Sequence, residues 1–454
     1  MSLLLTLALA CSTPAPDAPA DAPATAPTAT ANPAPPPGQH GQPGNHGQPN
    51  KPTNPPPGGE QGMQDPSGFP KFHDMPAPDG PEPGPVGAFS EPFQLTAKPT
   101  GGYRPQIAVG PDDTLHAVYY DRTDDGDVVR YRQSKGGEWT APEAVSPLTG
   151  RNWGPDLVTL DDGGLVLTWD HAAPDFSSQG WFRERSPGGA WGEALRMTPE
   201  SDYEVGSTHV ATAGDGELAY VYIGRTFGDF SRPFVAYWRW RKGDTWTEPV
   251  AFSDGSASAW HTNVESRPDG SVAAGWDEGP GGSSTVVFVA SGKDGAFDAP
   301  ENLSRNAKQG ERPHWAFIEG GGDIEGIEDH VVYFHRGQQS RPLAVYHRAG
   351  KPGAWGPVNT PSEGLGGYHF DPEIAVSEDG TLCMVWGWDA GEKAELLYSL
   401  NTGDGWSAPL RVAEIGWGKP GLPSIDIDSA GTFHVVWNQG VRGYNEVYYA
   451  TLKL

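Results

Sequence analysis

Cysteine and basic residues are scarce in this 454-residue chain. The two cysteines, Cys11 and Cys383, allow at most one disulfide, so the fold cannot depend on a disulfide framework. Lysine and arginine number 31 against 58 acidic residues, and the net charge of -27 disfavours binding to duplex nucleic acid or to an anionic membrane surface. After residue 87, no run of apolar residues is long enough to form a transmembrane helix. Phosphate-binding glycine loops, cysteine pairs and His-Glu zinc motifs are also missing, so we predict no cofactor and no metal site.

Residues 1–11 form a short apolar run that ends in small residues before Cys11. This run resembles a bacterial lipoprotein signal peptide with its lipobox. The resemblance implies that Cys11 is lipidated and begins the mature protein, which leaves Cys383 without a cysteine partner. It also implies a cell-envelope location, anchored to the outer membrane or the cell surface. If the lipobox is not used, the protein is secreted.

Residues 12–87 are rich in proline, alanine and glycine and contain hardly any aliphatic side chain. Such a segment cannot bury enough apolar surface to offset the entropy lost on ordering. We therefore predict a disordered tether that spaces a folded domain away from the anchored end.

One short phrase, an aromatic residue followed shortly by proline or alanine, recurs through the rest of the chain. Its seven aromatic residues lie 50 to 58 residues apart: Phe89, Trp139, Trp191, Trp246, Phe297, Trp355 and Trp406. A period of this length is typical of a propeller, a solenoid or an array of small domains. Because every repeat contains one, we expect these aromatics to fill the wedges between repeats and not to form a sugar-binding row.

Each repeat has the same internal order, seen clearly in residues 372–386. A short apolar strand is followed by an Asp-Gly hairpin signal, a second strand that ends on an aromatic residue, a third strand and the recurring phrase. The first strands begin near Pro105, Pro155, Thr208, Thr262, Pro313, Pro372 and Pro423. The last repeat stops after three strands, and residues 89–96 supply the missing fourth. The sequence thus predicts an all-β fold over 88–454, a seven-bladed β-propeller of four-stranded antiparallel blades closed by the N-terminal strand.

The hairpins before the recurring aromatic, such as Ser134 to Trp139 and Asn401 to Trp406, resemble degenerate Asp boxes. On this basis residues 88–454 resemble the sialidase-like superfamily of propellers with BNR repeats. Asp boxes are structural turns, so they support the fold and not an activity. Tyr103-Arg104-Pro105 is similar to the Arg-Ile-Pro motif of sialidases, whereas no other catalytic residue of that family aligns. Sialidases also have six blades, so their activity is not transferred.

Loops that enter the first strand and leave the second strand of each blade lie on one face of a propeller, around its central channel. From these loops we select eleven candidate ligand-binding residues, which combine guanidinium groups, imidazoles and aromatic planes. They are Tyr103, Arg104, Trp153, Trp260, His261, Arg312, His314, His335, Tyr368, His369 and Trp388. Such groups suit a sugar that bears a carboxylate, because arginine binds the acid and aromatic rings stack on the sugar.

We predict a non-catalytic module that binds a glycan or another extracellular ligand on this face. One alternative is a glycoside hydrolase or polysaccharide lyase for acidic glycans, with His261, His314 or His369 as base and Tyr368 as acid. A platform for protein partners is a third possibility. The loop 121–127 is rich in aspartate, yet it lacks the distal glutamate of an EF-type calcium loop and is interpreted as a polar hairpin. The small-ligand hypotheses require that Arg104, His261, Arg312 and His369 converge on one depression.

Overall fold

A computed structural model describes residues 77–454, except for twelve short gaps. The gaps are 97–100, 124–125, 147–148, 174–176, 199–202, 227, 230, 280–284, 305–309, 320–326, 337–341 and 442–443. The predictions of a signal peptide at 1–11 and of lipidation at Cys11 lie outside the described residues, as does the predicted tether of residues 12–87 up to residue 76. Among the described residues, no helix is long and apolar enough to cross a membrane.

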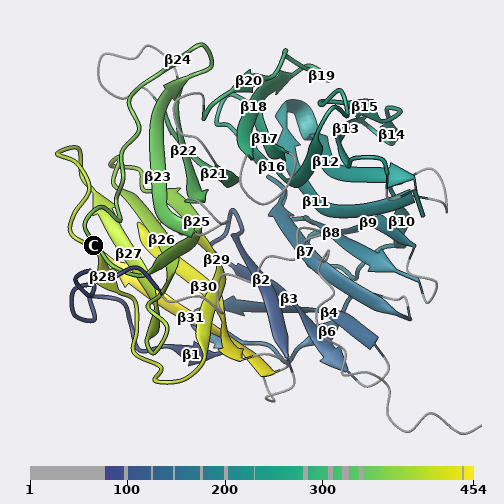
Figure 1. Ribbon diagram of the computed structural model, residues 1–454. Helices are drawn as coiled ribbons and strands as arrows, with labels where there is room; N and C mark the ends of the chain where they lie inside the picture. The colour runs from purple at the N-terminus through teal and green to yellow at the C-terminus, as the bar shows by residue number, and fades with distance from the viewer. Residues whose placement is uncertain are drawn as a thin grey trace, which may run out of the picture. The chain divides into compact units, whose positions relative to one another are not determined.

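The strands of the described residues form seven antiparallel sheets that follow one another around a ring, as the colours of Figure 1 show. The first three sheets are β2 (Gly102–Val109), β3 (Leu115–Thr123), β4 (Gly126–Lys135), β5 (Glu138–Trp139) and β6 (Glu143–Ala144); β7 (Arg151–Thr159), β8 (Leu165–Ala172), β9 (Ser178–Arg185) and β10 (Leu195–Arg196); and β11 (Tyr203–Ala213), β12 (Glu217–Thr226), β13 (Val235–Lys242), β14 (Thr245–Trp246) and β15 (Val250–Ala251).

The next three sheets are β16 (Ser258–Ser266), β17 (Val272–Gly279), β18 (Val286–Lys293), β19 (Ala296–Phe297) and β20 (Glu301–Asn302); β21 (Glu311–Glu319), β22 (Ile327–Arg336), β23 (Pro342–Lys351) and β24 (Ala354–Trp355); and β25 (Tyr368–Val376), β26 (Leu382–Asp389), β27 (Ala394–Asn401) and β28 (Leu410–Arg411). The seventh is β29 (Lys419–Ile427), β30 (Thr432–Val441), β31 (Tyr444–Lys453) and β1 (Phe93–Gln94). These sheets are called blades one to seven below, and they confirm the predicted seven-bladed propeller.

The turns between the first and second strands explain why the Asp-Gly signal recurs. In blade six, Asp379 Oδ1 accepts a hydrogen bond of 3.0 Å from the Thr381 backbone N–H, and Gly380 has a φ of 84°. Blade four repeats the arrangement at Asp269, whose Oδ1 accepts a hydrogen bond of 2.9 Å from the Ser271 N–H. The aspartate satisfies the turn backbone and the glycine supplies the left-handed conformation.

The ring closes between its two ends, as predicted. Strand β1 pairs with β31, with Phe93 opposite Tyr449. Next to it, the Leu95 N–H donates a 2.8 Å hydrogen bond to the Val447 carbonyl, and the Leu95 side chain is fully buried against blade one. The closure joins the N-terminal segment to the last blade, where β1 covers the edge of β31.

The substitution Leu95→Ala is expected to lower the free energy of unfolding by about 2–5 kcal/mol, because it removes buried methyl groups and leaves a cavity. Urea denaturation measures this change. Phe93→Ala, two residues away, is the control: its side chain is 48% exposed, so we expect less than about 1 kcal/mol. Equal effects of the two substitutions would contradict the closure.

Residues 78–87 contact blade six before the expected domain start at residue 88. Gly84 N–H donates to the Pro409 carbonyl at 3.0 Å, and Gly87 N–H donates to the Arg411 carbonyl at 2.8 Å. Val86 forms a parallel bridge with Arg411. These residues belong to the propeller, because their backbone groups are satisfied by its outer edge.

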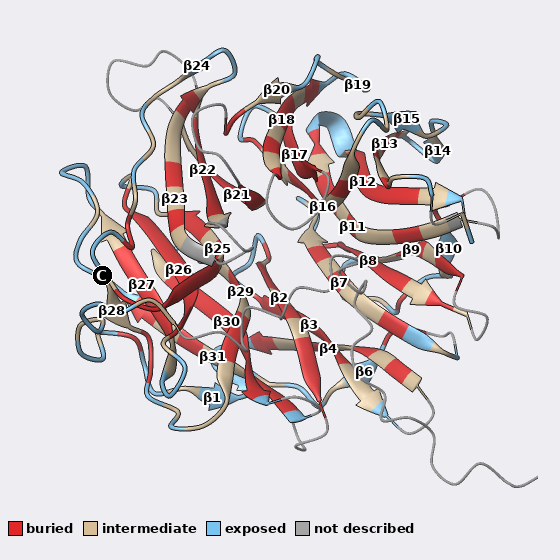
Figure 2. Ribbon diagram, in the orientation of Figure 1, coloured by how far each residue is buried: buried red, intermediate tan, exposed pale blue. Residues whose placement is uncertain are grey.

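The core lies between neighbouring blades. Four tryptophans were expected to end the second strands, but each strand continues three or four residues beyond its tryptophan. Trp169, Trp276, Trp386 and Trp437 are each at most 1% exposed. Trp191 and Trp406, from the recurring phrase, pack against the core clusters of adjacent blades. Figure 2 shows this burial along the middle strands and exposure mainly at the outer turns. The recurring aromatics are therefore packing residues, as predicted. Cys383 is fully buried and free.

Candidate functional site

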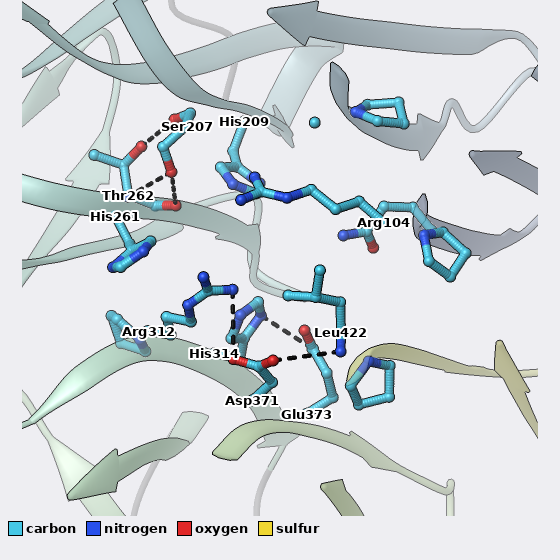
Figure 3. Close-up of a pocket in the computed structure, with 16 residues that line it drawn as sticks. Arg104, Ser207, His209, His261, Thr262, Arg312, His314, Asp371, Glu373 and Leu422 are labelled. Atoms are coloured by element: carbon cyan, nitrogen blue, oxygen red, sulfur yellow. Dashed lines mark hydrogen bonds and ion pairs between the residues drawn. The ribbon is translucent and has the colours of Figure 1, made fainter. Parts of the chain in front are cut away.

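Each first strand contains a β-bulge near its start. In six blades the first bulged residue lines one axial pocket, and in blade four His261, the residue after the bulge, takes that place (Figure 3). These mouth residues are Arg104, Gly154, Ser207, His261, Arg312, Asp371 and Leu422. Six of them have a φ between 45° and 57°, and His261 is the exception. A side chain other than glycine costs about 1–3 kcal/mol in this conformation, and such strain clusters at functional sites.

Aspartates from one blade hold the mouth residues of the next. Asp170 Oδ2 accepts the Ser207 N–H at 3.1 Å, and Asp277 Oδ1 accepts the Arg312 N–H at 3.3 Å. Asp170 and Asp277 are fully buried, each two residues before the end of its second strand, β8 or β17. The strained bulges are therefore fixed by hydrogen bonds across the blade interfaces.

Two arginines, Arg104 and Arg312, are mouth residues, and they differ in whether their guanidinium forms an ion pair. Arg312 Nη1 lies 3.4 Å from Asp371 Oδ1 and forms an ion pair with it. Arg104 forms neither a hydrogen bond nor an ion pair with any residue that the structure describes, and it extends into the pocket (Figure 3). His261, 27% exposed, places its Nδ1 2.8 Å from the buried Asp277 Oδ1. Within the described part of the chain, the pocket thus offers an anion one guanidinium that has no hydrogen-bond or ion-pair partner.

Two residues beyond each mouth residue, a second ring of polar side chains lies at the boundary between the pocket and a larger channel. The belt residues are Gln106, Asp156, His209, Asn263, His314, Glu373 and Ser424. His314 Nδ1 lies 3.0 Å from Glu373 Oε2 and 2.9 Å from Asn263 Nδ2. The pocket has a volume of about 70 Å³ and the channel about 540 Å³. Since one water needs roughly 10–15 Å³ by this measure, the pocket accepts a group of carboxylate size but not a whole sugar.

Carboxylates dominate the channel beyond the belt, and removal from bulk water changes how they titrate. Burial raises the pKa of Asp426 to about 6 and raises the pKa of Glu265 well above its usual range. Burial also raises the pKa of Glu373, against the opposing influence of His314. These carboxylates therefore bind a proton at higher pH than exposed carboxylates do.

The structure brings four of the eleven sequence candidates together: Arg104, His261, Arg312 and His314 line the pocket. Trp153, Trp260 and His335 are half-buried and line neither the pocket nor the channel. Tyr103, Tyr368, His369 and Trp388 are buried in the protein. His369 Nδ1 accepts a 3.1 Å hydrogen bond from Trp386 Nε1, and Trp388 Nε1 donates 2.7 Å to the Gly366 carbonyl. The expected convergence therefore holds for Arg104, His261 and Arg312, and fails for His369.

Sequence reasoning missed Gly154, Ser207, His209 and Glu373. The signal was present, because the mouth residue directly precedes each predicted strand start, and a proline occupies that start in five blades. Side chains alternate along a strand, so the residue before the mouth faces the neighbouring blade and the residue two beyond it lines the channel. On blade six, the residue before the predicted strand start is Asp371 and the residue two beyond it is Glu373. These two residues line the pocket, whereas Tyr368 and His369 do not.

One group of metal-ligating side chains gathers within the described residues: His261, Asp277 and Glu311, whose ligand atoms lie within 4.8 Å of one another. Asp277 Oδ1 already accepts from Arg312 N–H and contacts His261, and Glu311 Oε1 accepts 3.2 Å from the Thr285 hydroxyl. The group is thus held as a hydrogen-bonded cluster. In the aspartate-rich hairpin, Asp121 pairs with Arg130 and Asp127 pairs with Arg151, both at 3.1 Å.

Fold and pocket together define a seven-bladed β-propeller with an axial polar pocket. No family model matches the chain, and no curated protein matches it either. Among solved structures, a protein of unknown function from Dyadobacter fermentans matches with a TM-score of 0.51 and 16% identity, covering 81% of this chain and 100% of that chain.

The GH93 α-L-arabinofuranosidase of Fusarium graminearum, solved with arabinobiose, matches with a TM-score of 0.50 and 13% identity over 81% of this chain and 98% of that chain. A leech intramolecular trans-sialidase matches with a TM-score of 0.48 and 10% identity over 68% and 69%. At these identities the similarity shows the fold alone.

Proposed function

We propose that this protein is a surface-tethered, non-catalytic module whose axial pocket binds the acidic end of a glycan. The observation that carries the proposal is Arg104, a guanidinium that lines the pocket without an ion-pair partner among the described residues. Arg312 and His261 line the same pocket and add positive or hydrogen-bonding groups. Arginine binds carboxylates through two parallel hydrogen bonds, which fits an acid group of the size that the pocket accepts.

The remainder of the ligand lies on the open face, because the pocket of about 70 Å³ holds only its terminal group. The proposal also places the protein in the cell envelope, held by a lipid at Cys11 and spaced by residues 12–76. Growth with radiolabelled palmitate tests the anchor: wild type is expected to incorporate label and Cys11→Ser is not. Label in both proteins, or in neither, would contradict it.

A glycan array that contains uronate and sialate ends tests the binding function. Wild type is expected to bind acidic ends, and Arg104→Gln is expected to bind about 10–100-fold more weakly, because a charged hydrogen bond contributes about 1.5–3 kcal/mol. Arg232→Gln is the matched control, since the Arg232 side chain is 68% exposed and forms an ion pair with Asp229 nearby in the chain. Retained binding by Arg104→Gln, or no binding by wild type, would contradict the proposal.

A polysaccharide lyase is the second candidate, favoured by the contact between His261 and the buried Asp277. An imidazole oriented by a buried carboxylate can remove a proton next to a carboxylate that Arg104 binds. The acid partner considered for this role, Tyr368, is only 1% exposed and does not line the pocket, so we rank binding first. Release of unsaturated ends from polyuronates, lost in His261→Gln, would establish the lyase. Binding without product supports the module.

A further inference from the structure

The acidic side chains on the pocket wall limit how much positive charge the pocket carries. Two carboxylates line the wall within the described residues, Asp371 and Glu373. Asp371 is the mouth residue of blade six, and its Oδ1 lies 3.4 Å from Arg312 Nη1. This ion pair cancels the charge of one wall arginine. The other, Arg104, has no ion-pair partner in the part of the chain that the structure describes, so the two wall arginines leave one positive charge uncompensated.

The three histidines on the wall add no net positive charge to this count, because each has its Nδ1 beside a carboxylate oxygen. The pairs are His209 with Asp156 at 3.5 Å, His261 with Asp277 at 2.8 Å and His314 with Glu373 at 3.0 Å. A protonated imidazole is neutralised by its ionised partner, and a neutral imidazole leaves the pair neutral or negative. The pocket therefore carries at most one positive charge in excess.

We propose that Asp371 is a specificity-determining residue, which restricts the pocket to an acid group with one negative charge and rejects a doubly charged phosphate. A monoanion balances the one excess charge, which Arg104 supplies. A dianion would bring a second negative charge next to Asp371, and like charges placed together at a binding site reject the wrong partner. This inference rests on the proposed function, and it narrows the ligand to glycans whose acid group is singly charged.

The geometry of Asp371 keeps its carboxylate on the pocket wall and allows its charge to be removed without moving the backbone. Its side chain is 18% exposed, and Figure 3 shows it between Arg312 and Leu422. The Leu422 N–H donates to Asp371 Oδ2 at 3.4 Å, which the oxygen of an asparagine can also accept. The φ of Asp371 is 50°, a left-handed conformation that asparagine adopts as aspartate does. Asp371→Asn should therefore fold.

Three matched ligands test the inference by isothermal titration calorimetry at pH 8: D-galacturonate, D-galactose 6-sulfate and D-galactose 6-phosphate. They carry different acid groups on the same carbon of the same sugar. The sulfate has the tetrahedral shape of the phosphate but a single charge, whereas the phosphate is doubly charged at this pH. Wild type is expected to bind galacturonate, and to bind the sulfate about tenfold or more tightly than the phosphate.

Asp371→Asn removes one negative charge from the wall and releases Arg312 for the ligand. Coulomb energy is proportional to the charge of the ligand, so the dianion gains twice the free energy that a monoanion gains. We expect affinity to rise about threefold for galacturonate and the sulfate and about tenfold for the phosphate. Asp404→Asn is the matched control and should bind all three ligands like wild type. Asp404 is exposed on the hairpin after β27, at the end of blade six opposite the pocket.

A measurement on wild type at pH 5 decides the question even if Asp371→Asn does not fold. The phosphate then carries one charge, so the preference for the sulfate is expected to fall below about threefold. A preference that persists at pH 5, or that is unchanged in folded Asp371→Asn, would overturn the inference.

The remaining outcomes separate this inference from the proposed function. If wild type binds galacturonate and Arg104→Gln does not, while wild type binds the phosphate as tightly as the sulfate, the role of Asp371 is wrong and the proposed function stands. Rejection of both sulfate and phosphate by wild type and by Asp371→Asn would assign the selectivity to size and would also overturn the role of Asp371. If wild type binds none of the three ligands, the proposed function and this inference fail together.

Discussion

Replacing Arg267 by alanine is expected to lower the free energy of unfolding by about 3–5 kcal/mol, because it leaves a buried carboxylate without its partner. Arg267 follows β16 in blade four and reaches Asp329 on β22 in blade five. Its Nε donates 2.8 Å to Asp329 Oδ1, and its Nη2 lies 2.5 Å from Oδ2. The two side chains are only 7% and 4% exposed. The pair therefore links two neighbouring blades in a site with little access to water.

Chemical denaturation of Arg267→Ala measures this effect, and the exposed pair Lys135–Asp112 provides the comparison. Those side chains are 68% and 59% exposed, so Lys135→Ala is expected to cost less than about 1 kcal/mol. The double variant Arg267→Met with Asp329→Leu is expected to recover most of the loss, since an apolar pair removes both charges together. A cost below 1 kcal/mol for Arg267→Ala would show that the buried pair does not hold the blades.

The second large effect is the response of His369 to acid. Burial lowers the pKa of His369 to about 4, and its Nδ1 accepts from Trp386, which requires the neutral imidazole. The unfolded chain binds a proton near pH 6.5, whereas the folded protein binds it only near pH 4. Stability from this group is therefore complete above pH 6.5 and falls as the pH drops toward 4. The loss at pH 4.5 is about 2 kcal/mol.

The pH profile of His369→Gln isolates this contribution from the other titrating groups. We measure the free energy of unfolding of both proteins from pH 7.5 to 4.5. The difference between variant and wild type is expected to move by about 2 kcal/mol in the variant's favour toward low pH, because glutamine does not titrate. A pH-independent difference would contradict the assigned protonation. His347, whose pKa burial lowers to about 3, is expected to behave in the same direction.

The fold followed from the sequence because the same features recur seven times. The Asp379-Gly380 pair favours a turn wherever it occurs in the chain. The even spacing of the aromatic residues from Phe89 to Trp406 predicts the number of blades. Even the closure could be predicted, since residues 89–96 matched the strand that the last repeat lacks. Because the same local signal occurs in every repeat, a single degenerate copy does not change the predicted fold.

The site followed only in part, because its members are the residues that do not repeat. Arg104, His261 and Arg312 were found by their position before a strand, whereas His369 lies two residues before the mouth and points into the core. Gly154 carries no chemical signal of its own. Its position next to the buried Asp170 arises only when strands β7 and β8 pair.

The bulge shared by all seven blades has a consequence for how binding specificity can change. Backbone hydrogen bonds and prolines fix the mouth conformation, while the side chains there range from glycine to arginine. Seven positions on one rigid frame tolerate different side chains, so many combinations of side chains can be placed around the same pocket. A library randomised at these positions is expected to yield propellers with new ligands and unchanged blades, so this ring can serve as an engineered receptor scaffold.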